Sequence, residues 1–253
     1  MKPGSLLITL CTYNERDNVA LLVPELLAVV PDAEVLIVDD GSPDGTGRLA
    51  DEFANENPRV RVLHRAGKQG LGSANLASYR YAIENQYEYL LNLDADYSHP
   101  PRFAPQIVAG MQNADVVIGS RYVSGGSIIG WTWQRRVMSW MINFWARLWL
   151  GLKTRDNSGS YRCYRVAMLA RIDWSLAVST GYAFQEEILY RCRRAGCRIV
   201  ESPITFEERR YGTTKINTRE CVKAIFDIVV LGFQNLRGVP VLLPGQGEKI
   251  GSC

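Results

Sequence analysis

The stretch LLNLDADYSHPP, residues 90–101, is an apolar run that ends in two carboxylates, Asp94 and Asp96, placed one residue apart. Like charges at this spacing repel each other, and burying them is costly unless a positive group lies between them. The stretch therefore admits three interpretations: a site for a divalent metal ion, a site for a cationic ligand, or an exposed acidic turn without a function.

The same succession of an apolar run and a polar cluster occurs at two earlier places. Residues 5–11 lead into Thr12-Tyr13-Asn14-Glu15, and residues 33–38 lead into Asp39 and Asp40. The other segments alternate between helical and strand patterns. Helical patterns cover 16–30, a stretch after the second cluster that ends at about 57, and 72–86, and strand patterns cover 59–64 and 114–121. This alternation predicts an α/β fold with a mostly parallel sheet flanked by helices. Such sheets bind ligands at the carboxyl ends of their strands, so the polar clusters should form one rim.

After about residue 122 the pattern is less regular. We expect a helix with five of the chain's six tryptophans over 131–152, a turn and short strand over 156–165, a helix over 182–195, a strand-like stretch over 197–208 and a last helix over 215–236. No internal repeat or interdomain linker is present in the sequence. These patterns predict a single domain over 1–236 and a C-terminal tail over 237–253, with disorder from residue 244 onward.

Composition and charge exclude several classes of protein. The formal net charge of +3 does not indicate a nucleic-acid partner. The six cysteines form no CxxC pair, so a zinc site is not expected. The first residues lack the features of a signal peptide, and no apolar run approaches the roughly 20 residues of a membrane span. We therefore expect a cytoplasmic protein with reduced thiols.

Two turns near the predicted rim are candidates for nucleotide contacts. Asp39 and Asp40 precede the tight turn of residues 41–46, and a plain helix cap would need only one Asp or Ser. One of the two carboxylates should therefore point into the crevice, where it can accept hydrogen bonds from a nucleotide base. The loop KQGLGSA, residues 68–74, is either a phosphate-cradling loop or a simple helix start, and its glycines alone leave both interpretations open.

Basic and aromatic residues gather in the second half. A basic cluster in loops and helix starts consists of Arg121, Arg135, Arg136, Arg209, Arg210 and Lys215. Such charges suit a reaction in which a diphosphate leaves, and a solvated basic face is the alternative. The tryptophan-rich helix is apolar almost all the way round and is interrupted by arginines, a combination typical of the headgroup boundary of a bilayer. This favours a membrane-facing or lipid-binding helix over a buried core helix.

The ordered motifs carry a family likeness. TYNE at 12–15, VDDGSPDGT at 38–46, KQGLGSA at 68–74, DADYSHPP at 94–101 and GSRY at 119–122 resemble the family 2 glycosyltransferases, whose fold is the Rossmann-like GT-A fold. In the second half, RRVMSWMIN at 135–143, DNSGSYRCYR at 156–165, GYAFQEEI at 181–188 and FEERRYGTTK at 206–215 resemble the dolichol-phosphate mannose synthases. The likeness covers nearly all of residues 5–236.

This resemblance implies a donor site. The nucleotide would be held by Tyr13, Glu15, Asp39, Asp40 and Asp94. The carboxylates of Asp94 and Asp96 would bind Mg²⁺ or Mn²⁺ together with the donor diphosphate. Two positions depart from the family pattern, because Cys11 replaces the usual proline and Ser98 stands where relatives often carry glutamine.

The resemblance also implies an acceptor site and a closing loop. The phosphate of a lipid would be held by Arg121, Arg135 and Ser139, and a mobile basic loop with Arg209 and Lys215 would close over the phosphates. Thr214 replaces the serine that usually precedes this lysine. The catalytic residues implied are Asp96, Arg121, Arg209 and Lys215.

The function implied is an inverting transfer of mannose from GDP-mannose to dolichyl or polyprenyl phosphate. A phosphate with a second pKa of roughly 6 is largely dianionic at pH 7, so it needs positioning rather than a strong base. Glu186 and Glu187 are therefore expected to contact the sugar or the loop. The nucleotide-binding half would span about 5–121 and the acceptor half about 122–236.

The resemblance further implies a peripheral protein on the cytoplasmic side of a membrane. Attachment to the membrane surface is expected through the tryptophan-rich helix, the helix over 215–236, or a separate small membrane-anchoring subunit. Two alternatives to the implied function stay open. One is transfer of another sugar to the same kind of lipid, for example glucose from UDP-glucose, and the other is a catalytically inactive binding subunit on the same fold.

Overall fold

The computed structural model describes residues 4–177, 179, 181, 183–209, 218–238 and 240–244. Within them the strands are β1 (Leu6–Thr12), β2 (Ala33–Asp39), β3 (Val60–His64), β4 (Tyr89–Asp94), β5 (Val116–Ser120), β6 (Ser127–Ile128), β7 (Arg162–Arg165), β8 (Ile199–Pro203) and β9 (Thr205–Phe206). The helices are α1 (Arg16–Val29), α2 (Thr46–Glu56), α3 (Leu71–Glu84), α4 (Ala104–Ala109), α5 (Trp133–Leu150), α6 (Val166–Leu169), α7 (Phe184–Arg194) and α8 (Thr218–Leu236). Short 3₁₀ turns lie at Pro101–Phe103, Gly110–Asn113 and Trp174–Leu176.

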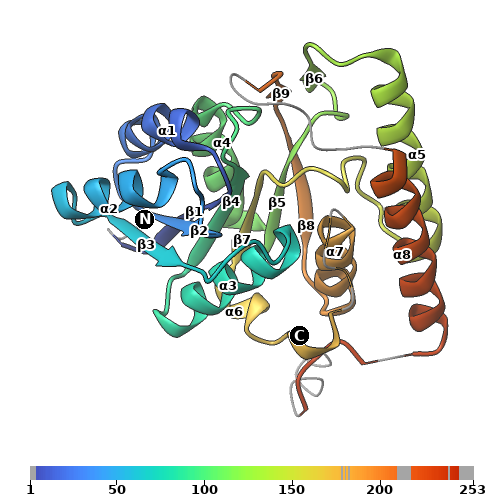
Figure 1. The fold of residues 1–253 in the computed structure, drawn as a ribbon. Helices are drawn as coiled ribbons and strands as arrows, with labels where there is room; N and C mark the ends of the chain where they lie inside the picture. Colours follow the sequence, from blue (N-terminus) through green and yellow to red (C-terminus); the bar gives the residue numbers. More distant parts are fainter. Residues whose placement is uncertain are drawn as a thin grey trace.

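One large sheet forms the centre of the molecule (Figure 1). Among the described residues it has seven strands, in the order β3-β2-β1-β4-β7-β5-β8. Neighbouring strands are parallel except at β7, which runs antiparallel to both β4 and β5. The mostly parallel α/β sheet predicted from the sequence is therefore confirmed. The antiparallel position of β7 between β4 and β5 was not part of that prediction.

The chain reverses its path across the sheet beside β1. It runs from β1 outward through β2 to β3 and then returns to β4 on the other side of β1. Such a reversal leaves a crevice outside the carboxyl ends of the two strands, which is where ligands bind in this class of sheet. In the register, Cys11 pairs with Asp94 and Thr12 pairs with Asp39. The three polar clusters predicted from the sequence therefore lie along one edge.

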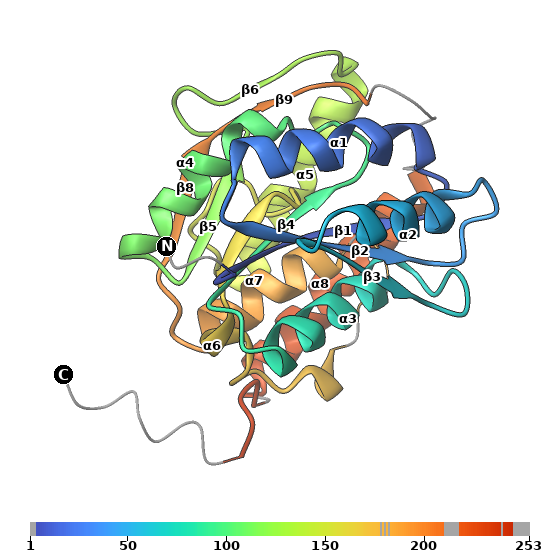
Figure 2. The ribbon, with the colours of Figure 1, turned by 90° about the vertical axis from the view of Figure 1, so that its left-hand side faces the viewer.

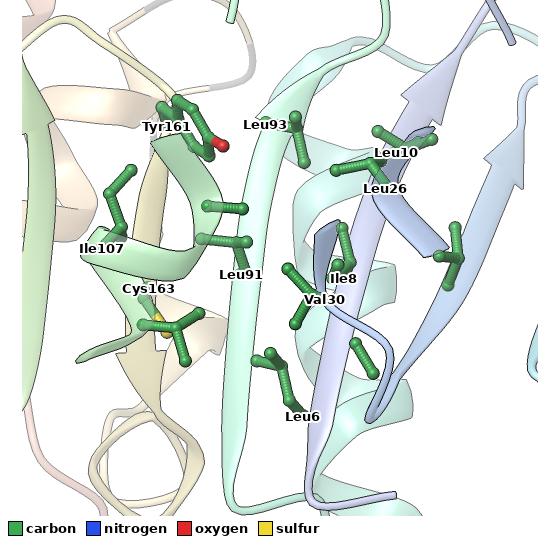
Figure 3. Packing of buried hydrophobic residues seen from close by; sticks show 14 of the residues in the cluster. Leu6, Ile8, Leu10, Leu26, Val30, Leu91, Leu93, Ile107, Tyr161 and Cys163 are labelled. Atoms are coloured by element: carbon green, nitrogen blue, oxygen red, sulfur yellow. The ribbon is translucent and has the colours of Figure 1, made fainter. Parts of the chain in front are cut away.

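Helices cover both faces of the sheet, with α1 and α4 on one side and α3, α6 and α7 on the other (Figure 2). Alternate side chains of β1 serve the two faces: Leu6, Ile8 and Leu10 pack in the cluster with α1, and Leu7 packs in the cluster with α3. Leu26 of α1 lies in the first cluster, as Figure 3 shows. Burial on both faces explains why the central strands are mostly apolar in sequence.

The tryptophan-rich segment forms α5, which packs beside α8 at the edge of the molecule (Figure 1). The hydroxyl of Thr132 caps its start by accepting a hydrogen bond from the backbone N–H of Arg135 at 3.4 Å. Gly151 ends the helix in the left-handed conformation, with φ of 63°. The expected helix over 131–152 is thus present with slightly shorter bounds.

The exposed and half-buried tryptophans of α5 divide between two faces of the helix. Trp145 and Trp149 pack against the core, whereas Trp133 and Trp140 of α5 are 70% and 62% exposed. One face of this helix therefore packs against the core, and contact of its exposed face with a membrane or a lipid stays a prediction. Across the part of the chain that the structure describes, no helix combines the length and the apolar character needed to cross a membrane.

Part of the expected C-terminal tail is ordered. Leu242 forms an antiparallel bridge with Ile172, and the N–H of Leu243 donates a hydrogen bond to the carbonyl of Arg171 at 3.0 Å. Residues 245–253, for which disorder is expected from the sequence, lie outside the described residues.

Candidate active site

A cavity of about 560 Å³ opens at the carboxyl edge of the sheet. Its wall combines the ends of β1 and β4, the start of α3, the inner face of α5, the first turn of α7, a part of α8 and the loops after β5 and β9. Of the site residues predicted from the sequence, the wall includes Tyr13, Glu15, Asp40, Asp94, Asp96, Arg121, Arg135, Ser139 and Arg209. The predicted residues Arg210, Thr214 and Lys215 lie outside the described residues.

The two carboxylates that follow β2 have different surroundings. Asp39 is not part of the cavity wall, and its Oδ1 accepts hydrogen bonds from the hydroxyls of Thr12 at 3.1 Å and Ser42 at 2.5 Å. Asp40 reaches the wall, where its Oδ1 pairs with Nη1 of Arg65 at 2.6 Å. Asp39 therefore ties the turn to β1, and Asp40 is the carboxylate that faces the cavity. A nucleotide contact by Asp39 stays a prediction.

Near Asp40 the wall is aromatic and apolar. Nζ of Lys68 lies 4.7 Å from the ring centroid of Tyr13. The side chains of Cys11, Leu71 and Ala74 line the same cavity. A flat aromatic ring beside apolar side chains, with a carboxylate and an ammonium group at the same wall, suits a planar base that carries hydrogen-bonding groups.

The glycine-rich loop serves two purposes. Gly70 borders the cavity with φ of 93°, immediately before α3. Gly72 permits close packing instead, since a Cβ at this position would lie 3.0 Å from the carbonyl of Ser179 and 3.1 Å from Phe184. The loop is therefore both the start of a helix and a part of the cavity wall.

The two carboxylates of the 94–96 motif are held by their neighbours. Oδ1 of Asp94 accepts a hydrogen bond from the hydroxyl of Ser160 at 2.6 Å. Oδ1 of Asp96 accepts one from the N–H of Ser98 at 3.0 Å, and its Oδ2 lies 3.1 Å from Nη2 of Arg209. A cationic group therefore already neutralises one of the two carboxylates, as the spacing of the charges requires.

The residues present fit a divalent ion that takes few protein ligands. Among the described residues, no group of three or more His, Cys, Asp and Glu side chains could hold a metal ion. Mg²⁺ typically uses one or two carboxylates and completes its shell with water and substrate phosphates, which Asp94 and Asp96 could provide for. The hydroxyl of Ser98 is buried and, within the described part of the chain, has no hydrogen-bond partner, so one oxygen beside this pair is still available.

Arg121 lines the cavity and is held rigidly by its neighbours. Its Nε and Nη2 donate to the two carboxylate oxygens of Asp156 at 2.7 and 2.6 Å, and Nη2 also donates to the hydroxyl of Ser158 at 2.9 Å. Burial alone would lower the pKa of this guanidinium, but the adjacent Asp156 carboxylate raises it above its usual range. Nη1 takes no part in these three bonds, and Arg121 lines the cavity. Asp156 therefore orients this arginine through Nε and Nη2, which leaves Nη1 for a ligand.

Arg135 faces the same space. Its guanidinium lies 4.2 Å from the ring centroid of Trp131, and its Nε is buried without a hydrogen-bond partner among the described residues. Burial and the positive charges of Arg209 and Arg121 lower the pKa of Arg135. A bound anion such as a phosphate would offset the repulsion that Arg135 experiences from these two arginines.

The remaining members of the basic cluster and the predicted Ser139 differ in position. Ser139 lines the cavity, and its hydroxyl accepts a hydrogen bond from the hydroxyl of Tyr122 at 2.7 Å. Arg136 is exposed, donates to the carbonyl of Ile128 at 2.8 Å and is not part of the wall. The sequence cluster therefore divides into cavity arginines and at least one surface arginine.

Several residues of the cavity wall were not predicted from the sequence. Lys223 and Ala224 of α8 reach the cavity, although they are more than a hundred residues from the 94–96 motif. Gln185 also lines it, directly before the two glutamates. For Gln185 the signal available was its place beside Glu186 in the GYAFQEEI motif. For α8 no pattern pointed to Lys223.

The adjacent glutamates of α7 have separate environments. Glu186 lines the cavity. Glu187 is fully buried away from it, with Oε1 at 2.6 Å from Nη2 of Arg191 and Oε2 accepting the N–H of Ser179 at 2.7 Å. A sugar contact is therefore compatible with Glu186, whereas Glu187 fastens the segment before α7.

Comparison with known proteins identifies one matching family model and similar proteins that are named as glycosyltransferases. Residues 7–173 match the family model described as glycosyl transferase family 2. The chain is 42% identical over 221 residues to an undecaprenyl-phosphate mannosyltransferase of Micrococcus luteus, covering 87% of this chain and 91% of that protein. It is 41% identical over 230 residues to a polyprenol monophosphomannose synthase of Mycolicibacterium smegmatis, covering 90% of this chain and 87% of that protein.

A solved structure shares the fold. Glucosyl-3-phosphoglycerate synthase from Mycobacterium tuberculosis, in complex with Mn²⁺, UDP and glucosyl-3-phosphoglycerate, matches with a TM-score of 0.63 and 16% identity, over 94% of this chain and 81% of that chain. At this identity the likeness concerns the fold, which is that of the GT-A glycosyltransferases. The family match and the two relatives reach further than the fold, and they show that the chain belongs to glycosyl transferase family 2.

Proposed function

We propose that this glycosyltransferase moves mannose from GDP-mannose to a polyprenyl or dolichyl phosphate, with inversion at the sugar carbon. The names of the two similar proteins support the mannosyl group and the lipid phosphate. The observation that carries the proposal is the cavity itself, in which the carboxylates of Asp94 and Asp96 share a wall with three arginines. That arrangement suits two phosphate-bearing substrates that must approach each other despite their charge.

The donor would occupy the end of the cavity near β1 and α3. Tyr13, Glu15 and Asp40 would contact the nucleoside, and Asp39 would contribute by holding the turn. Asp94 and Asp96 would hold Mg²⁺ or Mn²⁺, which when bound would draw charge from the leaving nucleoside diphosphate.

Arg209 would stabilise charge at the same place from the protein side. It neutralises Asp96 in the structure, at 3.1 Å, and a guanidinium there can bind the donor's phosphates as readily as a carboxylate. Lys215 is proposed to act with it, as the family resemblance implies.

The acceptor phosphate would lie among Arg121, Arg135 and Ser139. A dianionic phosphate is itself a nucleophile, so the reaction requires orientation rather than proton removal. Glu186 agrees with this mechanism, because burial raises its pKa to about 8 and it is a neutral acid at pH 7, unsuited to act as a base.

The lipid chain and the membrane would meet α5. Met138 and Ile142 line the cavity from the inner face of this helix. Its outer face exposes a stripe of large apolar residues, namely Trp133, Val137, Trp140, Met141, Phe144 and Leu148, and the neighbouring α8 exposes Phe226 and Phe233. We propose that this stripe rests on the cytoplasmic surface of a membrane, so that a lipid phosphate can reach the cavity beside it. A small membrane-anchoring subunit would be an alternative occupant of the same stripe.

A transfer assay tests the proposed function. Purified protein, Mg²⁺ or Mn²⁺, a short polyprenyl phosphate and radiolabelled GDP-mannose or UDP-glucose would be incubated and extracted into organic solvent. Label in the lipid phase from GDP-mannose alone is the expected result. Label from UDP-glucose alone would replace mannose as the sugar, and nucleotide binding without transfer from either donor would favour the inactive binding subunit.

A further inference from the structure

The first turn of α7 places two polar side chains in the cavity wall with their hydrogen-bonding capacity unused. Gln185 is 3% exposed and Glu186 is 2% exposed, and both line the cavity. Oε1 and Nε2 of Gln185 and Oε2 of Glu186 have no hydrogen-bond partner within the described residues. A buried polar group without a partner costs about 1–3 kcal/mol, so three such atoms on two residues of the cavity wall indicate a ligand or water there.

The contrast with the next residue shows that this is not a general property of the helix. Glu187 is equally buried, yet its carboxylate is paired with Arg191 and accepts the N–H of Ser179. The turn of α7 therefore directs one glutamate into the protein, where it is satisfied, and directs Gln185 and Glu186 to the cavity, where they are not.

The chemistry of the pair favours an uncharged ligand over a phosphate. Burial raises the pKa of Glu186 to about 8, with smaller influences from the charged groups Arg162, Asp156 and Arg121. The carboxyl group is therefore neutral at pH 7 and can both donate and accept a hydrogen bond, as the amide of Gln185 can. Sugar hydroxyls are also neutral and also do both, whereas a phosphate offers only acceptors and negative charge.

The position of the pair agrees with this ligand. The wall segment of Ser158, Gly159 and Ser160 lines the same cavity. Ser158 accepts from Arg121 and Ser160 donates to Asp94, so this segment links the proposed acceptor and donor sites. Arg162 adjoins it, with Nη1 donating to the backbone carbonyl of Gln185 at 2.6 Å. The pair thus lines the same cavity as Asp94 and Asp96, the carboxylates that would hold the diphosphate next to the donor's sugar.

We propose that Gln185 and Glu186 bind the hydroxyl groups of the transferred hexose and so help to select the sugar. This inference rests on the proposed function in one respect, namely that the cavity holds a nucleotide sugar. It separates the pair from Glu187, which is a structural residue of the same helix.

Calorimetric titration of the whole chain in the presence of Mg²⁺ tests this, with GDP-mannose and GDP, and with UDP-glucose and UDP, as the probes. The variants are Gln185→Ala, Glu186→Leu and Glu186→Gln. For the donor that the wild type uses, Gln185→Ala and Glu186→Leu should lower its affinity or its kcat/KM by about tenfold or more. The affinity for the bare nucleoside diphosphate should stay unchanged, because that part of the donor does not touch the pair. Glu186→Gln should retain most of the wild-type affinity for the donor, since an amide also donates and accepts hydrogen bonds.

The matched control is Glu187→Gln. This change weakens the ion pair with Arg191 and should lower the free energy of unfolding. The ratio of the affinity for the sugar nucleotide to the affinity for the bare nucleoside diphosphate should stay as in the wild type. The inference is overturned if both Gln185→Ala and Glu186→Leu leave donor affinity and kcat/KM intact, or if they weaken the sugar nucleotide and the bare nucleotide equally. If Glu186→Leu does not fold, Gln185→Ala decides. A wild type that binds a sugar nucleotide but labels no lipid phosphate would contradict the proposed function, and the affinity ratio would still decide the inference.

Discussion

Replacing Asp156 should lower both the stability and the transfer activity of the protein, and a second replacement at Arg121 should separate these two effects. Asp156 is fully buried, and its carboxylate accepts hydrogen bonds from Nε, Nη2 and the backbone N–H of Arg121 at 2.7, 2.6 and 2.9 Å, and from the N–H of Gly159 at 3.2 Å. Burial alone would raise the pKa of this carboxyl, but Arg121 holds it below its usual value, so the pair stays ionised at neutral pH.

The size of the effect follows from this burial. Removing one partner of a buried ion pair leaves the other charge uncompensated, which costs about 3–5 kcal/mol. That is a large part of the roughly 5–15 kcal/mol by which a typical domain is stable. Asp156→Ala should therefore lower the free energy of unfolding by about 3–5 kcal/mol, and it should reduce transfer because Arg121 is no longer oriented toward the cavity.

The assay compares urea unfolding and transfer kinetics in Asp156→Ala, Arg121→Met and the combination Asp156→Leu with Arg121→Met. The double variant buries no charge at this place, so it should recover part of the lost stability. Its activity should stay low, because Nη1 of Arg121 is missing from the site. A stable and fully active Asp156→Ala would refute the reasoning, and so would a double variant that regains activity together with stability.

Four other outcomes are expected. Asp96→Ala should abolish transfer and the metal dependence of donor binding, and near-normal turnover would contradict the metal assignment. Arg135→Ala should raise the KM for lipid phosphate more than the KM for the sugar nucleotide, and the reverse pattern would reassign this arginine to the donor. Replacing the exposed Trp133 and Trp140 by serine should weaken flotation with anionic liposomes several-fold at unchanged thermal stability, whereas unaltered partitioning would argue against the membrane surface. Glu186 has a raised pKa in the folded state, about 8 against 4.5, so its contribution to stability is present below pH 4.5 and is lost as the pH rises toward 8. Glu186→Gln should therefore gain stability relative to the wild type between pH 5 and pH 8, by a few kcal/mol in urea unfolding, and equal pH slopes would contradict the buried neutral acid.

Much of the fold could be predicted because its signals are local. The strands β1, β2 and β4 are mostly apolar runs, and such runs followed by polar residues predict parallel strands whose carboxyl ends share an edge. The four-residue strand β7 carries no such signal, since Arg162–Arg165 contains two arginines in a short segment. Its antiparallel place between β4 and β5 depends on pairing with strands that lie far away in the chain.

In the candidate site too, some features follow from local sequence signals and others depend on contacts between distant segments. The sequence indicated that one of two adjacent carboxylates, Asp39 or Asp40, would face the crevice, but it could not say which. The hydrogen bonds of Asp39 to Thr12 and Ser42 decide this, because they hold its carboxylate against β1. In α7, Glu186 and Glu187 are likewise equivalent in sequence, and the buried Arg191 determines which of them turns away from the cavity.

The amino-acid sequence by itself determined the class of fold, the edge of the sheet that carries the site, and the kinds of groups found there, because strand periodicity and turn chemistry depend on near neighbours. Only the tertiary structure decided which carboxylates and arginines share a cavity, how Asp156 orients Arg121, and that α7 and α8 complete the wall. These features arise from contacts between segments that are distant in the chain, where burial and charge pairing select one orientation of each side chain.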